Sequence, residues 1–271
     1  MEQDLKMRAR EIREQTALCI GSIGIGHIGG CLSLAEILAN LYFKHMRVDS
    51  QNPQMQGRDR LVVSKGHAGP AVYAALALKG YFPLEELLTL NQSNTNLPSH
   101  CDMNKTPGID MTAGSLGQGF SCAVGIALAS RLKGDNATIY AIVGDGESQE
   151  GQIWEAAMYA GSQKLRNLIA FTDYNDMQID GHVHEVNNIS PLEDKWRAFN
   201  WHVISVDGHD AHQIDQAIQE AKTQEKPTMI IARTIKGKGV SFVEAKGPGC
   251  HNMPFSQDDA QKAIEELRRE K

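Results

Sequence analysis

A chain of 271 residues with 41% apolar content and a formal net charge of −6 at pH 7 is long enough to bury the core of one large α/β domain. Because the sequence has no Lys/Arg-rich run, it lacks the basic stripe that neutralises nucleic-acid phosphates. No segment approaches the roughly 20 apolar residues of a membrane span, and the charged start is unlike a secretory signal. We therefore expect a cytoplasmic protein that binds neither nucleic acid nor membrane.

The first half of the chain is predicted to be mainly helical. The first helix is amphipathic, because residues spaced by four and three fall on one face of it: Leu5, Ala9, Ile12, Thr16 and Cys19. A Gly-rich turn over 21–30 ends this helix, and Ser33 is expected to cap a second helix that continues to Leu41. The segments that follow are a buried strand at 61–63, helices near 68–79 and 84–90, a polar loop over 91–113 and a small-residue helix over about 117–133.

Strands and helices alternate in the second half. Apolar runs predict strands at 138–143, 168–173, 202–206 and 228–233, and the expected helices lie at 151–164, 191–199, 210–223 and 256–270. Such alternation is typical of a mainly parallel sheet covered by helices on both faces, which is a three-layer α/β/α fold. No linker or repeat interrupts the chain, so we interpret residues 1–271 as a single domain with N-terminal helices.

Polar residues follow two of these strands at the point where each strand ends. Gly144-Asp145-Gly146 comes directly after the strand at 138–143, and Asn175 follows the strand at 168–173. If the strands are adjacent, their backbones lie about 4.8 Å apart, and ligands bind at the carboxyl edge of such sheets. A carboxylate and an amide oxygen suit Mg²⁺ or Ca²⁺, and the helix expected from Gly151 favours an anion at its N-terminus. Few basic side chains lie near this pattern in the sequence, so we expect a metal-bound diphosphate.

The spacing of these residues resembles the thiamine diphosphate fingerprint of transketolases, oxo-acid dehydrogenases and decarboxylases. Twenty-eight residues separate Gly144-Asp145-Gly146 from Asn175. Three segments resemble transketolases in particular and occur in the same order, and the resemblance covers about residues 5–265: Ser64-Lys65-Gly66-His67-Ala68, Gly114-Ser115-Leu116-Gly117-Gln118-Gly119 and Gly144-Asp145-Gly146-Glu147-Ser148-Gln149-Glu150-Gly151.

The resemblance implies a set of cofactor and metal ligands. The metal, Mg²⁺ or Ca²⁺, would be bound by Asp145, Asn175 and the backbone carbonyl of Met177. Gly146, His67 and His251 would face the diphosphate. The full set of positions that the resemblance places beside thiamine diphosphate is His67, Gly114, Ser115, Leu116, Gly144, Asp145, Gly146, Glu147, Asn175, Ile235 and His251.

The resemblance also implies the residues that act on the substrate. His27, His67, His100 and His251 would stabilise oxyanions or move hydroxyl protons, because imidazole does both near neutral pH. This sequence departs from the family beside two of them, with Ile28 where proline is common and Asn252 where glycine is usual. The remaining six histidines match no motif and are interpreted as surface or structural residues: His45, His182, His184, His202, His209 and His212.

All the matched motifs belong to the diphosphate-binding half of a transketolase. After the strand at 228–233 only a loop and one helix remain, which leaves no room for a second sheet. The expected partner is therefore a separate pyrimidine-binding, C-terminal transketolase subunit, in an α2β2 assembly. The resemblance also implies a catalytic position for Glu150, which matches the family's glutamate at the subunit interface, where carboxylates of the two halves connect the paired cofactors. The implied reaction transfers a two-carbon ketol unit from a ketose to an aldose. The donor is open among ordinary, branched and sulfonated sugars.

Three other functions are weighed against this interpretation. Gly24-Ile25-Gly26-His27-Ile28-Gly29 satisfies the dinucleotide pattern, with Asp49 20 residues beyond it, and would suit a nicotinamide-dependent oxidoreductase. That pattern requires a preceding strand, whereas residues 4–20 have helical periodicity. The alpha subunit of a 2-oxo-acid dehydrogenase shares the metal fingerprint, although the His67 and Gly114 segments favour transketolase. A non-catalytic subunit would have lost Asp145 and Asn175.

Overall fold

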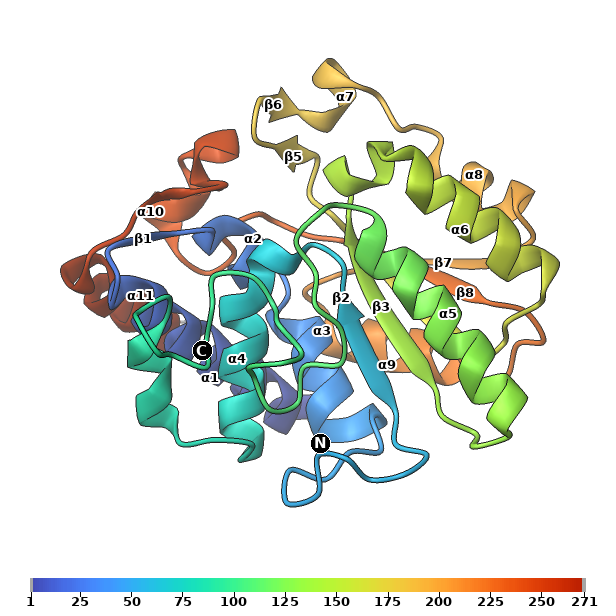
Figure 1. Cartoon of the computed structure of the whole chain (residues 1–271). Coiled ribbons are helices and arrows are strands. Elements are labelled where there is room, and N and C mark those ends of the chain that lie inside the picture. Colours follow the sequence, from blue (N-terminus) through green and yellow to red (C-terminus); the bar gives the residue numbers. More distant parts are fainter. Residues whose placement is uncertain (1, 270–271) are drawn as a thin grey trace.

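The computed structural model describes residues 2–269, and its centre is a five-stranded parallel sheet (Figure 1). Every pair of neighbouring strands in this sheet runs parallel. The strand order is β2-β3-β4-β8-β7, with bounds Arg60–Val63, Ile139–Gly144, Leu168–Tyr174, Thr228–Arg233 and His202–Asp207. The five expected strands are therefore confirmed, and the strands that carry Asp145 and Asn175 at their ends are direct neighbours.

Side chains alternate between two buried faces of the sheet. In β3, Tyr140 and Ile142 belong to one apolar cluster, whereas Ile139, Ala141 and Val143 belong to another. The first cluster includes residues of α1 (Glu2–Gly21), α3 (Ala35–Asn40) and α9 (Ala211–Ala221), and the second includes residues of α5 (Gln118–Lys133), α6 (Gly151–Ser162) and α8 (Leu192–Ala198). Because both faces are covered by helices, the chain has the expected three-layer α/β/α architecture.

The first and last helices pack together beside the sheet. The face of α1 predicted from its spacing is buried along its whole length, from Leu5 to Cys19. Against it packs α11 (Gln257–Arg269), for which the sequence predicts 256–270, residue 270 lying outside the described part of the chain. Within residues 2–269 none of the helices is both long and apolar enough to cross a membrane.

The segment predicted as a Gly-rich turn contains regular structure. Strand β1 (Ile25–Gly26) pairs antiparallel with β9 (Met253–Pro254), and α2 (Ile28–Leu32) follows directly. The local pattern did not indicate this strand because its partner is more than 200 residues away in the chain. The pairing brings the segment that carries His27 next to the segment that carries His251.

The prediction that Ser33 caps a helix is wrong. Its hydroxyl donates to Gly30 O at 3.2 Å and to Asp173 Oδ2 at 2.8 Å, while α3 begins after Leu34 with no side-chain cap. The hydrogen bond from the Ser33 hydroxyl to the Asp173 carboxylate is stronger than a hydrogen bond between the hydroxyl and a neutral backbone N–H would be. The preceding α2 also supplies a carbonyl, Cys31 O, to the N–H of Leu34.

The remaining elements are short. The expected helix at 84–90 is a 3-10 helix, Leu84–Thr89, and α4 spans Gly69–Lys79. The segment between them and α5 has neither helix nor strand from 90 to 117, as expected for the polar loop. Elements that the sequence did not indicate are the hairpin of β5 (Met177–Gln178) and β6 (Gly181–His182), then α7 (Val183–Val186), α10 (Ser241–Glu244) and the short helical turns Leu41–His45, Gly66–Ala68, Gly146–Gln149 and Gly247–Cys250.

Candidate active site

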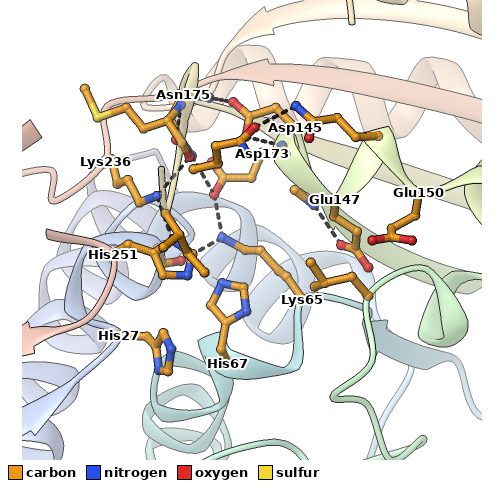
Figure 2. A pocket seen from close by; sticks show the side chains of 18 of the residues that line it. His27, Lys65, His67, Asp145, Glu147, Glu150, Asp173, Asn175, Lys236 and His251 are labelled. Atoms are coloured by element: carbon orange, nitrogen blue, oxygen red, sulfur yellow. Dashed lines mark hydrogen bonds and ion pairs between the residues drawn. The ribbon is translucent and has the colours of Figure 1, made fainter. Parts of the chain in front are cut away.

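A cleft of about 390 Å³ opens at the carboxyl end of β3 and β4 (Figure 2). Its volume lies in the range of small-molecule sites. It is lined by thirteen of the residues predicted from sequence, namely His27, His67, His100, Gly114, Leu116, Gly144, Asp145, Gly146, Glu147, Glu150, Asn175, Met177 and His251. Ser115 and Ile235 lie next to lining residues but outside the lining.

Asp145 lies at the base of the cleft and is only 2% exposed. Its Oδ1 accepts the N–H of Gly146 at 2.7 Å, and its Oδ2 accepts the N–H of Asn175 at 2.8 Å. Burial, reinforced by the nearby Asp173 carboxylate, raises the pKa of Asp145 to about 6. Hydrogen bonds from the N–H groups of Gly146, Asn175 and Asp176 lower this pKa without cancelling the effect of burial, so a cation would further stabilise the charge of Asp145.

The other predicted metal ligands present oxygens to the same region. Asn175 Oδ1 accepts the N–H of Met177 at 3.1 Å, and Met177 O accepts from Lys236 Nζ at 2.9 Å. Together with Asp145 they form a donor set of carboxylate, amide and carbonyl oxygens. Such a set matches Mg²⁺ or Ca²⁺ and is unsuited to softer metals.

A buried ion pair that the sequence did not predict supports these ligands from below. Lys65 Nζ donates to Asp173 Oδ2 at 2.5 Å and to Gly30 O at 2.8 Å, and Thr234 also donates to Asp173. Although burial would raise the pKa of Asp173, the Lys65 ammonium and its hydrogen bonds hold it below the ordinary value. The available signal was a carboxylate at the end of an otherwise apolar strand, which is rare without a buried partner.

Lys236, three residues beyond β8, is a second lysine that the sequence did not single out. Its Nζ donates to Met177 O and lies 3.1 Å from His251 Nδ1. Burial, and then the Lys65 ammonium, lower the pKa of Lys236. Two lysines thus line the cleft, which agrees with the expectation of few basic groups near the fingerprint. Both already have acceptors within the chain.

Four histidines converge on one wall of the cleft. The centroid of the His27 ring lies 5.0 Å from that of His67, 5.4 Å from that of His251 and 5.9 Å from that of His100. Burial first, and then Lys65, lowers the pKa of His67 to about 2, while burial and Lys236 lower that of His251 to about 3. Burial also lowers the pKa of His27. These three imidazoles are therefore neutral at physiological pH and can donate at one nitrogen while accepting at the other.

Glu147 connects the three motifs that carry the resemblance. Its Oε1 accepts from Ser64 Oγ at 2.5 Å and from the N–H of Gly117 at 2.8 Å. Its Oε2 accepts from the N–H of Gly144 at 2.9 Å. Glu147 therefore has a structural role, because its carboxylate ties the wall loops to the end of β3. Its role beside the cofactor stays a prediction.

The loop from 113 to 117 forms the open rim of the cleft. At Gly66 the backbone of this loop comes so close that an added Cβ would lie 2.0 Å from Ala113 O, which explains the glycine in the first motif. Beyond this contact Gly114 and Leu116 are exposed, and Ile179 across the cleft is 70% exposed. Glu150, at the start of α6, is also exposed.

The six unmatched histidines lie outside the cleft lining. Three of them pair with carboxylates elsewhere, His45 with Asp215, His202 with Glu220 and His209 with Glu36. His182 and His184 share Asp176, and His212 is exposed.

The dinucleotide interpretation fails on its structural context. Gly24–Gly29 follows helix α1 rather than a strand of the parallel sheet. The only strand within it, β1, pairs with β9 in the described part of the chain. A βαβ unit is required for this pattern to bind a dinucleotide, so the oxidoreductase alternative is wrong.

Comparison with known proteins identifies the family of this chain. The family model described as "Transketolase, thiamine diphosphate binding domain" matches residues 6–270. A 6-deoxy-6-sulfo-D-fructose transketolase subunit, SqwG, of Clostridium sp. (strain MSTE9) is 59% identical over 268 residues, which cover 98% of this chain and 97% of the relative. An apulose-4-phosphate transketolase subunit of Actinobacillus succinogenes is 37% identical, with the same coverage of 98% and 97%.

Solved structures of transketolases have the same fold. The enzyme from Leishmania mexicana superposes with a TM-score of 0.90 at 32% identity, and that from Campylobacter jejuni with a TM-score of 0.90 at 33% identity. Each match covers 98% of this chain but only 41% and 43% of the respective transketolase chain. The chain therefore spans about two fifths of the length of these solved enzymes.

Proposed function

The chain belongs to the transketolase family as its thiamine diphosphate binding domain, and on this premise we propose that it is the diphosphate-binding subunit of a two-subunit transketolase. The observation that carries the proposal is the all-oxygen donor set of Asp145, Asn175 and Met177 beneath a wall of neutral histidines. The family match to transketolase, rather than to 2-oxo-acid dehydrogenases, agrees with the His67 and Gly114 segments.

We propose that Asp145 Oδ, Asn175 Oδ1 and Met177 O hold the divalent cation that binds the diphosphate. The fit is supported by the raised pKa of Asp145, which a cation would reverse. Met177 O is engaged by Lys236, so this ammonium must give up or share the carbonyl when a cation binds. Gly146 keeps the floor open, since an added Cβ would lie 3.0 Å from the Cβ of Gln178.

Thiamine diphosphate, when bound, supplies the carbanion-stabilising ring that two-carbon transfer from a ketose to an aldose requires. The chain's own contribution lies in the histidine wall. Neutral His27, His67 and His251 are placed to donate a hydrogen bond to a developing oxyanion or to accept a hydroxyl proton. His100, which is exposed at the outer end of the cluster, would contact the sugar chain further out.

A separate partner subunit would complete the cleft. Relatives that match this chain along nearly their whole length are named subunits, whereas the solved transketolases are more than twice as long. The exposed rim formed by Gly114 and Leu116, with Glu150 beside it, is where a pyrimidine-binding, C-terminal subunit would dock. We propose an α2β2 assembly in which residues 1–271 act as one domain.

The donor substrate that we propose is a sulfonated ketose, namely 6-deoxy-6-sulfo-D-fructose. The relative named for that donor is 59% identical to this chain, whereas the relative named for apulose 4-phosphate is 37% identical. Both matches cover nearly the whole chain, so the difference is not caused by coverage.

The test is a two-carbon-transfer assay with an aldose phosphate acceptor, thiamine diphosphate and Mg²⁺. The purified chain is assayed alone and with a candidate pyrimidine-binding subunit, using 6-deoxy-6-sulfo-D-fructose, fructose 6-phosphate and apulose 4-phosphate as donors. Turnover is expected only with the partner and fastest with the sulfonated donor. Full turnover by this chain alone, shown by mass spectrometry to be free of other subunits, would refute the split enzyme. A preference for another donor would refute only the substrate assignment.

The metal assignment is tested separately by retention of cofactor after gel filtration. Asp145→Ala should lose retention of thiamine diphosphate, and excess chelator should have the same effect on the native chain. Tight binding of thiamine diphosphate in excess chelator would contradict the assignment of Asp145, Asn175 and Met177 as metal ligands.

A further inference from the structure

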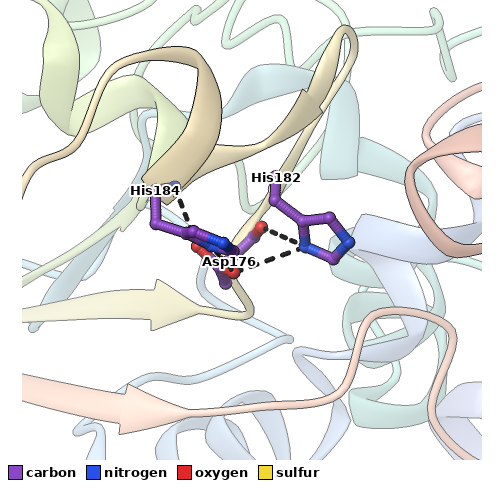
Figure 3. Close-up of side chains that lie close together, drawn as sticks. All are labelled: Asp176, His182 and His184. Atoms are coloured by element: carbon purple, nitrogen blue, oxygen red, sulfur yellow. Dashed lines mark hydrogen bonds and ion pairs between the residues drawn. The ribbon is translucent and has the colours of Figure 1, made fainter.

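We propose that Asp176, His182 and His184 form a second metal site, which takes a transition metal ion of the zinc class. The three side chains face one another at the base of the β5–β6 hairpin (Figure 3). Asp176 Oδ2 lies 2.5 Å from Nδ1 of His184 and 3.3 Å from Nδ1 of His182. One ligand atom from each residue can be chosen so that all lie within 4.8 Å of one another.

The backbone of the hairpin holds this arrangement in place. Val183 donates its N–H to Asp176 O at 3.0 Å, and the N–H of His184 donates to Asp176 Oδ1 at 3.1 Å. Asp176 itself has a φ of 59°, a left-handed conformation that aspartate tolerates better than most residues. With the backbone in this conformation, the carboxylate lies beside the strand that carries His182, with Oδ2 3.3 Å from Nδ1 of that residue. The three donors are close together without an ion, so little conformational entropy has to be lost on binding.

The chemistry of the donors selects a metal class different from that of the cleft. Two imidazole nitrogens and one carboxylate oxygen suit Zn²⁺, Co²⁺ or Ni²⁺, whereas the Asp145 set consists of oxygens alone. Three protein ligands leave a fourth position for water, as in open zinc sites. The side chains are 30%, 39% and 54% exposed for Asp176, His182 and His184, so an ion can reach them from solvent.

The position of the site gives it a structural consequence. Asp176 lies between Asn175 and Met177, which both line the cleft. An ion that joins Asp176 to His182 and His184 would restrain the hairpin and hence the two residues beside Asp176. The site itself is inferred from the hairpin geometry and does not depend on the proposed reaction.

The experiment titrates ZnCl₂ into the full chain, with binding measured by isothermal calorimetry and by competition with a chelating dye. Mg²⁺ and thiamine diphosphate are present at saturation, so that the cleft ligands are occupied first. Co²⁺ is used in parallel because its visible absorption reports a tetrahedral site with nitrogen ligands. The variants are His182→Gln, His184→Gln and Asp176→Asn. The matched control is His202→Gln, which removes another partly exposed histidine paired with a carboxylate.

One equivalent of Zn²⁺ should bind to the native chain and to His202→Gln. Loss of an outer-shell partner alone weakens metal sites roughly 10- to 100-fold, so removing either histidine should weaken binding by at least about 100-fold. Circular dichroism checks that the variants are folded, and Asp176→Asn, which preserves the shape of the side chain, gives an independent reading.

Two results would overturn the site. Absence of Zn²⁺ binding by the native chain at micromolar metal would leave Asp176, His182 and His184 as a hydrogen-bonded cluster only. Binding that survives in both histidine variants but is lost in His251→Gln would place the ion in the cleft instead.

Discussion

His209 Nε2 accepts a hydrogen bond from the backbone N–H of Ile235 at 2.8 Å. Since Nε2 is the acceptor, Nδ1 carries the proton and donates a hydrogen bond to Glu36 Oε2 at 3.1 Å. Glu36 is in turn held by both terminal nitrogens of Arg13, at 2.7 and 2.6 Å. A chain of contacts thus begins at the buried Arg13 of α1 and ends at Ile235, one residue before Lys236, which lines the cleft.

His209→Phe should weaken cofactor binding without directly touching the cleft. The Ile235 N–H would lose its acceptor, and the segment that carries Ile235, a predicted cofactor-binding residue, would lose this restraint. We expect roughly a 10-fold loss of thiamine diphosphate affinity, the low end for loss of an outer-shell partner, measured by quenching of tryptophan fluorescence. His45→Phe is the control, because His45 also pairs with a buried carboxylate, Asp215, at 2.9 Å. Equal losses in the two variants would contradict a specific role for His209.

Glu147→Gln should destabilise the chain although the two side chains have nearly the same shape. The amide oxygen can still accept from Ser64 and Gly117, but the amide nitrogen then faces the N–H of Gly144. A buried donor left without an acceptor costs about 1–3 kcal/mol. Urea unfolding measures this loss. Glu150→Gln, at an exposed carboxylate in the same segment, should stay within about 0.5 kcal/mol of the native chain.

The stability of the chain should fall as the pH drops below about 6.5, partly because of His67. The pKa of His67 is about 2 in the fold but about 6.5 in the unfolded chain, so the unfolded state binds the extra proton. The contribution is complete above about pH 6.5 and is lost as the pH falls towards the folded pKa.

Between pH 7.5 and pH 5 this group alone accounts for about 2 kcal/mol of unfolding free energy. His67→Asn should therefore show a weaker pH dependence in urea unfolding than the native chain. His212→Asn, which replaces an exposed histidine, should leave the dependence unchanged. An unaltered slope in His67→Asn would mean that the imidazole is not held neutral.

Two glycine substitutions should have opposite effects on stability. In Gly66→Ala the new Cβ would lie 2.0 Å from Ala113 O, so the rim loop must move and the chain should lose roughly 3 kcal/mol, the upper end of the usual cost of overpacking. Gly125 lies within α5 and has nothing within 4 Å of the added Cβ. Gly125→Ala should therefore stabilise by about 0.5–1 kcal/mol. Urea unfolding of both variants measures these changes in stability. A destabilised Gly125→Ala would contradict the placement of Gly125 at an open position of α5.

The sequence was most informative where the signals are local. Apolar runs located all five strands of the sheet and placed Asp145 and Asn175 at strand ends. That these two strands are neighbours was only a condition of the prediction, and it is met in the structure. Ser33 was misassigned because local capping rules do not include a carboxylate 140 residues away, Asp173, which takes its hydroxyl.

The charged residues of the cleft show the same limit. Lys65 lies inside a motif that the sequence singled out, but its partner Asp173 is set by the register of β4 against β3. The contact between Lys236 and Met177 O depends on the turn after β8 and on the position of the β5–β6 hairpin. Such pairings arise from contacts between distant segments, for which a single sequence has no periodic signal.

The Glu147 carboxylate has a consequence for any attempt to recombine this chain with its relatives. Its acceptors are filled by donors from the segments around 64, 117 and 144, so these segments form one cooperative unit. In a chimera that exchanges only one of these segments, the buried Glu147 carboxylate can lose one of its donors, or a donor can lose the carboxylate that accepts from it. Crossover points will be best tolerated outside residues 64–147, so that all three segments are inherited from one parent.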